Sequence, residues 1–255
     1  MDATRAPDPI TYLDEAAASA PGREYKQRLH AALELRPGHT VLDVGCGPGT
    51  DLAVLAVATG DSGAVIGVDH DPAMVEAARL RLAGYGNVTV HRGDAHALPL
   101  ADSSVDRARA DRVLQHLADP AWAIVELRRV VRTGGIVGLA EPDWDSFIVD
   151  DIDAQTSRAF GSFLAGRVRN PTIGRQLPRL LEGAGFALGS VVAHPVLLRD
   201  FGAADQILGL RRNTARAVEA GALDDRAAGQ WLDRLGTGPF LAGFTFFTVI
   251  ARAGD

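Results

Sequence analysis

The segment Val41–Thr50, with the sequence VLDVGCGPGT, constrains the fold of this chain more than any other stretch. Val41, Leu42 and Val44 form an apolar run that is typical of a buried strand. Three glycines follow at alternate positions, and they allow the backbone to turn sharply and to approach a ligand without a clashing Cβ atom. A helix over 51–59 comes next, so we expect its amino end to face whatever lies on this turn.

After residue 40 the chain alternates between strand and helix patterns, which indicates a parallel sheet with right-handed crossovers. The predicted strands are Thr40–Val44, Ala64–Asp69, Val88–Arg92, Val105–Ala110, Gly135–Glu141, Ser190–Leu198 and Thr245–Arg252. Helices are predicted at Tyr12–Ala20, Arg23–Leu35, Asp51–Thr59, Pro72–Gly84, Pro120–Val131 and Gly174–Gly183. We therefore expect a Rossmann-like α/β fold, with a seven-stranded, mostly parallel sheet and helices on both faces.

Length and charge narrow the class of protein. The 255 residues suit a single large domain over 1–255. A net charge of −6 without a basic run argues against nucleic acid as a partner. Without a long apolar run or a signal-like amino terminus, we expect cytoplasmic residence and no membrane contact. The lone Cys46 excludes an internal disulfide, and the absence of a zinc-ligand cluster predicts no metal site.

The glycine spacing resembles motif I of the class I S-adenosylmethionine-dependent methyltransferases, with Asp43 two residues before Gly45. A dinucleotide-binding fingerprint would place its third glycine at Thr50. Segments over 40–185 fit the methyltransferase family in the same order. The resemblance implies S-adenosylmethionine as cofactor and methyl transfer to an oxygen, nitrogen or carbon of a small molecule in specialised metabolism. It also implies that the last strand is antiparallel and lies between the fifth and sixth.

Acidic residues at the ends of the second and third strands are expected to hold the nucleoside. Asp69 is placed to accept hydrogen bonds from both ribose hydroxyls. Helix capping is the alternative role, which we assign to Asp71 because Pro72 suits the first helical position. The resemblance implies that Asp94 lies near the adenine amino group, with the amide of Ala95 on the ring; turn formation is the alternative for Asp94.

Further cofactor contacts are predicted in the glycine turn, in the first helix and beyond the fourth strand. The resemblance implies that Met74 packs against adenine, with core packing as the alternative. Asp111 is expected to pair with the α-ammonium group of the cofactor, and Arg112 to reach its carboxylate. The remaining predicted contacts are Tyr12, Gly45, Cys46, Gly47, Thr50 and His70.

The acceptor side is less well defined by the sequence. The segment Val113–Pro120, VLQHLADP, resembles the V-L-x-H-x-x-D-P signature of small-molecule methyltransferases. Its His116 is the best candidate for a general base, and an orienting or capping role is equally open. Asp143, after the fifth strand, is the second catalytic candidate, with a turn role as the alternative.

Three segments are expected to cover the acceptor. They are the amino-terminal helices over 10–36, the segment 145–171 and a helical insertion over 203–235. The arginines of Arg167–Arg175 suit an anionic group of the acceptor, although surface arginines are usually only solvated.

Alternative functions remain open at this stage. A cyclase or decarboxylase that binds S-adenosylmethionine without transferring its methyl group would use the same fold. A non-catalytic partner subunit is disfavoured by the intact motifs, and a nicotinamide-dependent oxidoreductase by the glycine spacing. The oligomeric state is left open, with a homodimer among the options.

Overall fold

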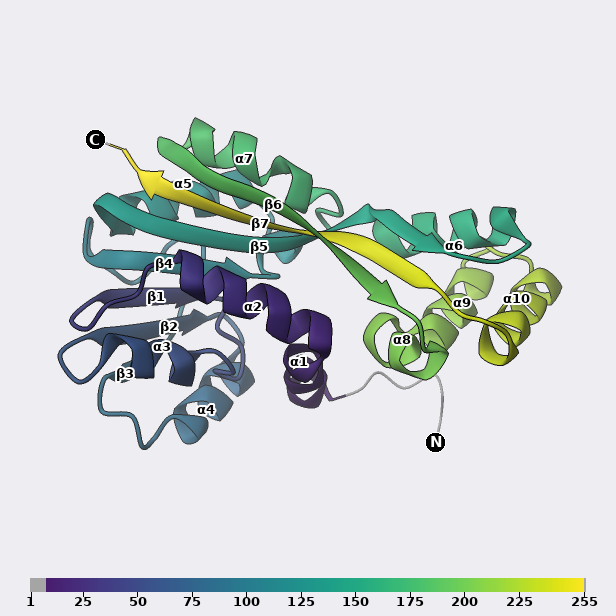
Figure 1. The fold of residues 1–255 in the computed structure, drawn as a ribbon, viewed down its shortest axis with the longest axis horizontal. Helices are drawn as coiled ribbons and strands as arrows, with labels where there is room; N and C mark the ends of the chain where they lie inside the picture. The colour runs from purple at the N-terminus through teal and green to yellow at the C-terminus, as the bar shows by residue number, and fades with distance from the viewer. Residues whose placement is uncertain (1–7, 255) are drawn as a thin grey trace.

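The computed structural model describes residues 8–254, and a seven-stranded sheet runs through them (Figure 1). Its strands are β1 (Thr40–Val44), β2 (Ala64–Asp69), β3 (Val88–Arg92), β4 (Val105–Asp111), β5 (Val131–Val149), β6 (Phe186–Leu198) and β7 (Ala242–Ala253). They lie in the order β3-β2-β1-β4-β5-β7-β6, and β7 is antiparallel to both of its neighbours. The predicted Rossmann-like sheet, with its antiparallel last strand between the fifth and sixth, is confirmed.

Helices cover both faces of the sheet because successive strand residues point to opposite sides. Val41 of β1 packs with α3 (Leu52–Thr59) and α4 (Pro72–Arg81), whereas Leu42 packs with α5 (Pro120–Val130) and α7 (Ile173–Gly183). Both residues are fully buried. The apolar run that predicted a buried strand thus packs into two apolar layers, one on each face of the sheet.

Of the two amino-terminal helices, the first lies at the carboxyl ends of the central strands and the second packs along one face of the sheet (Figure 1). They are α1 (Pro9–Ala18) and α2 (Ala20–Ala32), and each begins a few residues before its predicted start. Asp8 and Ser19 cap them by accepting from the backbone amides of Thr11 and Gly22. Leu29 of α2 packs against β5 and β7, which fixes this helix on the sheet.

Strands β5, β6 and β7 extend further than predicted. The predicted fifth strand ends at Glu141 because Pro142 reads as a turn residue. In the structure β5 continues to Val149, with an irregularity in its pairing to β7 between Asp143 and Ile148. Strand β7 lies between β5 and β6 and pairs with both of them. The three long strands therefore leave the main body as a ribbon.

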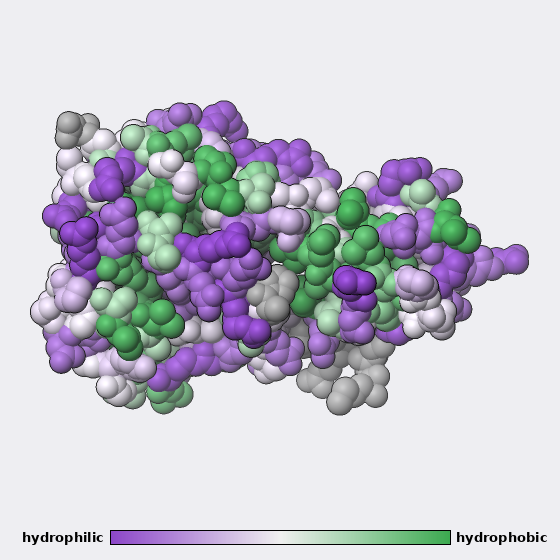
Figure 2. All heavy atoms as spheres, viewed as in Figure 1, coloured by the Kyte–Doolittle hydropathy of each residue, from purple (hydrophilic) through white to green (hydrophobic). Residues whose placement is uncertain are grey.

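This ribbon carries a second lobe made of helices. They are α6 (Ala154–Gly166), α8 (Phe201–Leu208), α9 (Leu210–Glu219) and α10 (Asp225–Thr237), and they lie together at the far end of the strands (Figure 1). The last three occupy the predicted insertion 203–235. Hydrophobic side chains gather on one face of the molecule over the strands that lead into this lobe (Figure 2). Within residues 8–254 we find no helix with both the length and the apolarity needed to cross a bilayer.

Phe160 and Trp231 are the centre of the second lobe. Both are fully buried, their rings lie 5.0 Å apart, and Trp231 Nε1 donates to Ser157 Oγ over 3.0 Å. We expect Phe160→Ala to lower the free energy of unfolding by about 3–5 kcal/mol, because it leaves a cavity where the ring packed. Urea unfolding measures this loss. The control Val57→Ala, at a side chain that is 73% exposed, should change stability by less than about 0.5 kcal/mol; equal losses in both variants would contradict the packing.

Candidate cofactor and acceptor site

The glycine turn after β1 has a backbone that only glycine adopts without strain. Gly45, Gly47 and Gly49 have φ values of 66°, 53° and 79°. A Cβ atom on Gly45 would lie 2.3 Å from Cγ2 of Val113. The turn is therefore held close to the loop after β4, and both loops face the carboxyl edge of the sheet.

The carboxylate of Asp69 links this turn to the end of β2. Its Oδ2 accepts from the amide of Gly47 over 2.8 Å, and its Oδ1 accepts from the amide of Asp71 over 2.9 Å. Asp71 itself caps α4 by accepting from the amide of Ala73, as predicted. Each Asp69 oxygen keeps acceptor capacity for a further donor, because an ionised carboxylate has about four acceptor sites.

A cluster of five buried charged side chains lies beneath the glycine turn. The guanidinium of Arg109, on β4, is 3.3 Å from Asp43, 2.7 Å from Asp51 and 3.0 Å from Asp111. Lys26 of α2 lies 2.7 Å from Asp111 and also pairs with Asp51. These side chains are at most 13% exposed. The cluster thus joins α2, β1, β4 and the start of α3.

Burial and ion pairing shift the pKa values of the carboxyl groups in this cluster in opposite directions. Burial raises the pKa of Asp43 to about 7, although the guanidinium of Arg109, 3.3 Å away, favours the charged form. Burial also disfavours the charge on Asp51, but Arg109 and Lys26 outweigh it and hold the pKa of that carboxyl below its ordinary value. Three acids and two bases are thus close-packed at the methionine side of the predicted site.

Arg112 adds a third base next to the cluster, and its backbone is unusual. Its φ of 59° lies in the left-handed region, which is costly for a residue with a side chain and is often found at functional sites. Its Nε is buried without a hydrogen-bond partner and lies 3.6 Å from Asp111. Tyr25 donates to the same Asp111 over 3.0 Å. The guanidinium is thus placed for a further acceptor.

A small cavity of about 50 Å³ lies against these groups. Its walls include the side chains of Lys26, Asp51, Arg109, Asp111 and Arg112, so both signs of charge face it. The predicted cofactor residues that line it are Asp43, Gly45, Cys46, Gly47, Thr50, Asp111 and Arg112.

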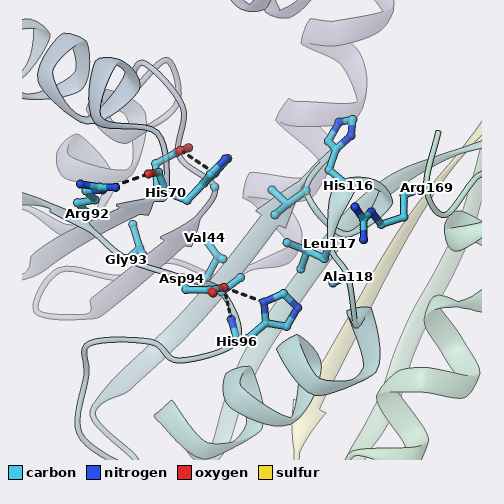
Figure 3. A pocket seen from close by; sticks show the side chains of 15 residues that line it. Val44, His70, Arg92, Gly93, Asp94, His96, His116, Leu117, Ala118 and Arg169 are labelled. Atoms are coloured by element: carbon cyan, nitrogen blue, oxygen red, sulfur yellow. Dashed lines mark hydrogen bonds and ion pairs between the residues drawn. The ribbon is translucent and has the colours of Figure 1, made fainter. Parts of the chain in front are cut away.

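A larger cavity of about 750 Å³ shares Gly45 with the small one (Figure 3). The predicted residues Asp69, His70, Asp94, Ala95 and His116 line it. Asp94 uses Oδ1 to accept from the amide of His96, and the His96 ring Nδ1 lies 2.7 Å from the same oxygen. The structure thus brings most of the predicted contacts to two adjoining cavities.

Two predicted cofactor contacts lie elsewhere. Tyr12 donates its hydroxyl to the carbonyl of Ile207 on α8 over 3.3 Å and lines a separate cavity between α1 and α8. Met74 is half-buried on α4 and is not among the residues that line the two cavities. Met74 is also absent from the hydrophobic clusters of the described residues, so its role, against adenine or in the core, stays a prediction.

The two acids at the end of β5 differ in their surroundings. Asp143 is 1% exposed and forms a two-point ion pair with Arg175, with 2.6 Å between Oδ1 and Nη2. It lines neither cavity. We therefore interpret Asp143 as an anchor for α7 instead of a base.

Glu141 is fully buried and has no cationic partner among the described residues. Its Oε1 accepts from the amides of Val113 and Leu114, over 2.7 and 2.6 Å, and its Oε2 has no partner. Burial raises the pKa of this carboxyl to about 8, although both amides favour the charged form. Glu141 thus fixes the loop after β4, which the sequence did not indicate.

The raised pKa of Glu141 predicts a pH dependence of stability. Between its ordinary pKa of 4.5 and its folded value of about 8, the folded protein keeps a proton that the unfolded chain releases. Stability should therefore fall as the pH rises through this window, by up to roughly 1.4 kcal/mol for each pH unit. Urea unfolding from pH 5 to 9 should show a shallower fall in Glu141→Gln; identical slopes in both proteins would contradict the assignment.

Comparison with known proteins agrees with this geometry. A solved S-adenosylmethionine-dependent methyltransferase from Aquifex aeolicus superposes with a TM-score of 0.55 at 26% identity, over 73% of this chain and 93% of that one. The demethylmenaquinone methyltransferase of Staphylococcus aureus is 34% identical over 113 residues, 44% of this chain and 47% of that protein. The fold and the relatives define an S-adenosylmethionine-dependent methyltransferase.

The family of this chain is shown by a family model that matches most of the strands of the sheet. A methyltransferase-domain family model matches residues 35–184, and the chain belongs to this family. An uncharacterised 37.1 kDa protein from a Streptomyces fradiae transposon, TN4556, is 52% identical over 248 residues, covering 97% of this chain and 72% of that protein. The resemblance seen in the sequence is confirmed.

Proposed function

We propose that this chain binds S-adenosylmethionine across the two cavities and transfers its methyl group to a small molecule of specialised metabolism. The observation that carries the proposal is that Gly45 lines both cavities, so two spaces with different chemistry adjoin at the glycine turn. One cavity presents paired charges and the other presents the carboxylates at the ends of β2 and β3.

The small cavity suits the methionine end of the cofactor. An amino acid group carries one positive and one negative charge, and the walls offer both signs within a buried volume. We expect Asp111 to accept from the ammonium group and the guanidinium of Arg112, whose Nε has no hydrogen-bond partner, to donate to the carboxylate.

The larger cavity suits the adenosine and the acceptor together. Asp69 keeps acceptor capacity for the ribose hydroxyls, and the free Oδ2 of Asp94 for the adenine amino group. The volume of about 750 Å³ is ample for a nucleoside with a further small molecule beside it.

The bound cofactor would supply a methyl group that its sulfonium already activates. The main work of the chain is then to hold the two reactants in line, which can contribute roughly 7–11 kcal/mol. His116 lies at the cavity wall, and burial together with Arg112 lowers its pKa below 6.5. The imidazole is therefore neutral at neutral pH and able to accept a proton from an acceptor hydroxyl or amine.

Cofactor binding can be tested without an acceptor. We expect S-adenosylhomocysteine to bind the purified protein in isothermal titration calorimetry, and NAD to show no binding. Asp69→Ala should weaken S-adenosylhomocysteine by at least about tenfold, because it removes a charged acceptor. The matched control Asp71→Ala removes a helix cap, so it should cost about 0.5–2 kcal/mol of stability and leave the affinity unchanged. Equal affinities in wild type and Asp69→Ala would contradict the ribose role.

The role of His116 can be tested once radiolabelled methyl transfer has identified an acceptor. A histidine base makes the rate rise with pH through its pKa, which lies below the ordinary 6.5 here. We expect this acidic limb to disappear in His116→Ala, with a rate loss of about 10²–10⁴-fold and unchanged S-adenosylhomocysteine affinity. Retention of most of the wild-type rate would point to transfer by proximity alone. Acceptor conversion without S-adenosylhomocysteine release would favour the cyclase or decarboxylase alternative.

A further inference from the structure

One end of the larger cavity carries positive charge without a carboxylate. The residues that line this end come from the loop after β4 and from the loop after α6, and they are Val113, His116, Leu117, Ala118 and Arg169. Of the acids of the cavity, Asp69 is the last residue of β2 and Asp94 follows β3. Figure 3 draws His116 and Arg169 across the view from His70 and Arg92.

Arg169 is exposed, but its loop is fixed to the loop after β4. Asn170 donates from Nδ2 to the carbonyls of Leu114 and Leu117, over 2.9 and 2.8 Å. The amide of Asn170 also donates to the carbonyl of Gln115 over 3.0 Å. These three bonds hold the segment around η1 (Leu114–His116) against the residue next to Arg169. The clamp keeps Arg169 and His116 at one wall.

Trp144, on β5, also binds both the loop after β4 and the loop after α6. Its Nε1 donates to Gln115 Oε1 over 2.9 Å, and its amide donates to the carbonyl of Pro171 over 2.8 Å. The two residues that follow Arg169, Asn170 and Pro171, are thus bound to ordered structure, which reduces the entropy that the loop would lose on binding a ligand.

The neighbouring arginines have other partners. The guanidinium of Arg167 lies 5.7 Å from the ring centre of Phe163, and that of Arg175 pairs with Asp143. Within residues 8–254, Arg169 forms no ion pair or hydrogen bond through its guanidinium, and it alone of the three lines the cavity. Its five N–H donors are therefore available to a ligand in the cavity.

We propose that Arg169 binds an anionic oxygen group of the acceptor, a carboxylate or a phosphate, with Asn170 as its positioning residue. The proposal rests on the methyl-transfer function proposed above, because it assigns this end of the cavity to the acceptor. A guanidinium suits both anions, since its fork matches their paired oxygens. The remainder of the acceptor would extend past His116 toward Gly45, where the two cavities meet.

The test uses the full chain saturated with S-adenosylhomocysteine. Sodium phosphate and sodium acetate are titrated separately, with sodium chloride keeping the ionic strength constant, and the ring signal of His116 is followed by NMR. We expect one of the two anions to give a saturable shift, and the anion that binds more tightly identifies the group. Arg169→Gln should weaken this binding by at least about tenfold, and Arg169→Lys should restore part of it because the charge returns.

The matched control is Arg167→Gln, which removes a nearby exposed guanidinium outside the cavity. It should change the anion affinity by less than about twofold. The proposal is overturned if neither anion gives a saturable shift, or if Arg167→Gln weakens binding as much as Arg169→Gln. Absence of S-adenosylhomocysteine binding at the outset would instead contradict the proposed function, so the two failures are distinguishable.

Discussion

The site depends on the ion pairs that the guanidinium of Arg109 forms. This guanidinium is fully buried at the carboxyl end of β4 and reaches three carboxylates, from β1, from the start of α3 and from β4 itself. Such a cluster adds little net stability, because the loss of solvation offsets much of the attraction. Removing one partner is costly, at about 3–5 kcal/mol, since it leaves a buried charge uncompensated. The cluster therefore fixes geometry more than it stabilises the fold.

Much of this arrangement could be predicted from local patterns. The strands β1, β2 and β3 have their predicted bounds, because each is a short apolar run between clear turn signals. The cap at Asp71 followed from the proline after it. The extension of β5 beyond Pro142 was not predictable, since only pairing with β7 shows that the proline lies within a strand.

The burial of Arg109 could not be read from the sequence either. The run of alternating arginines and alanines in β4 resembles a strand with one solvated face. In the structure α2 covers that face, and Lys26 arrives from a distant part of the sequence to share the carboxylates. The surroundings of Glu141 and Asp143 were equally unpredictable. These acids lie two residues apart, yet only Asp143 has a cation, Arg175, beside it. A charged residue on a strand has the role that its tertiary neighbours give it.

The three long strands that join the two lobes have a mechanical consequence. β6 and β7 pair without a break from Ser190 to Leu198, and β5 pairs with β7 on either side of its irregularity, so the lobes share one hydrogen-bonded ribbon instead of a flexible linker. Hinge bending between them would break strand pairing. The helix α1, by contrast, is bonded to α8 by the hydrogen bond from the Tyr12 hydroxyl to the carbonyl of Ile207. Because Leu13 and Ala17 of α1 line the small cavity, one wall of the proposed cofactor site belongs to a helix that this hydrogen bond ties to the second lobe.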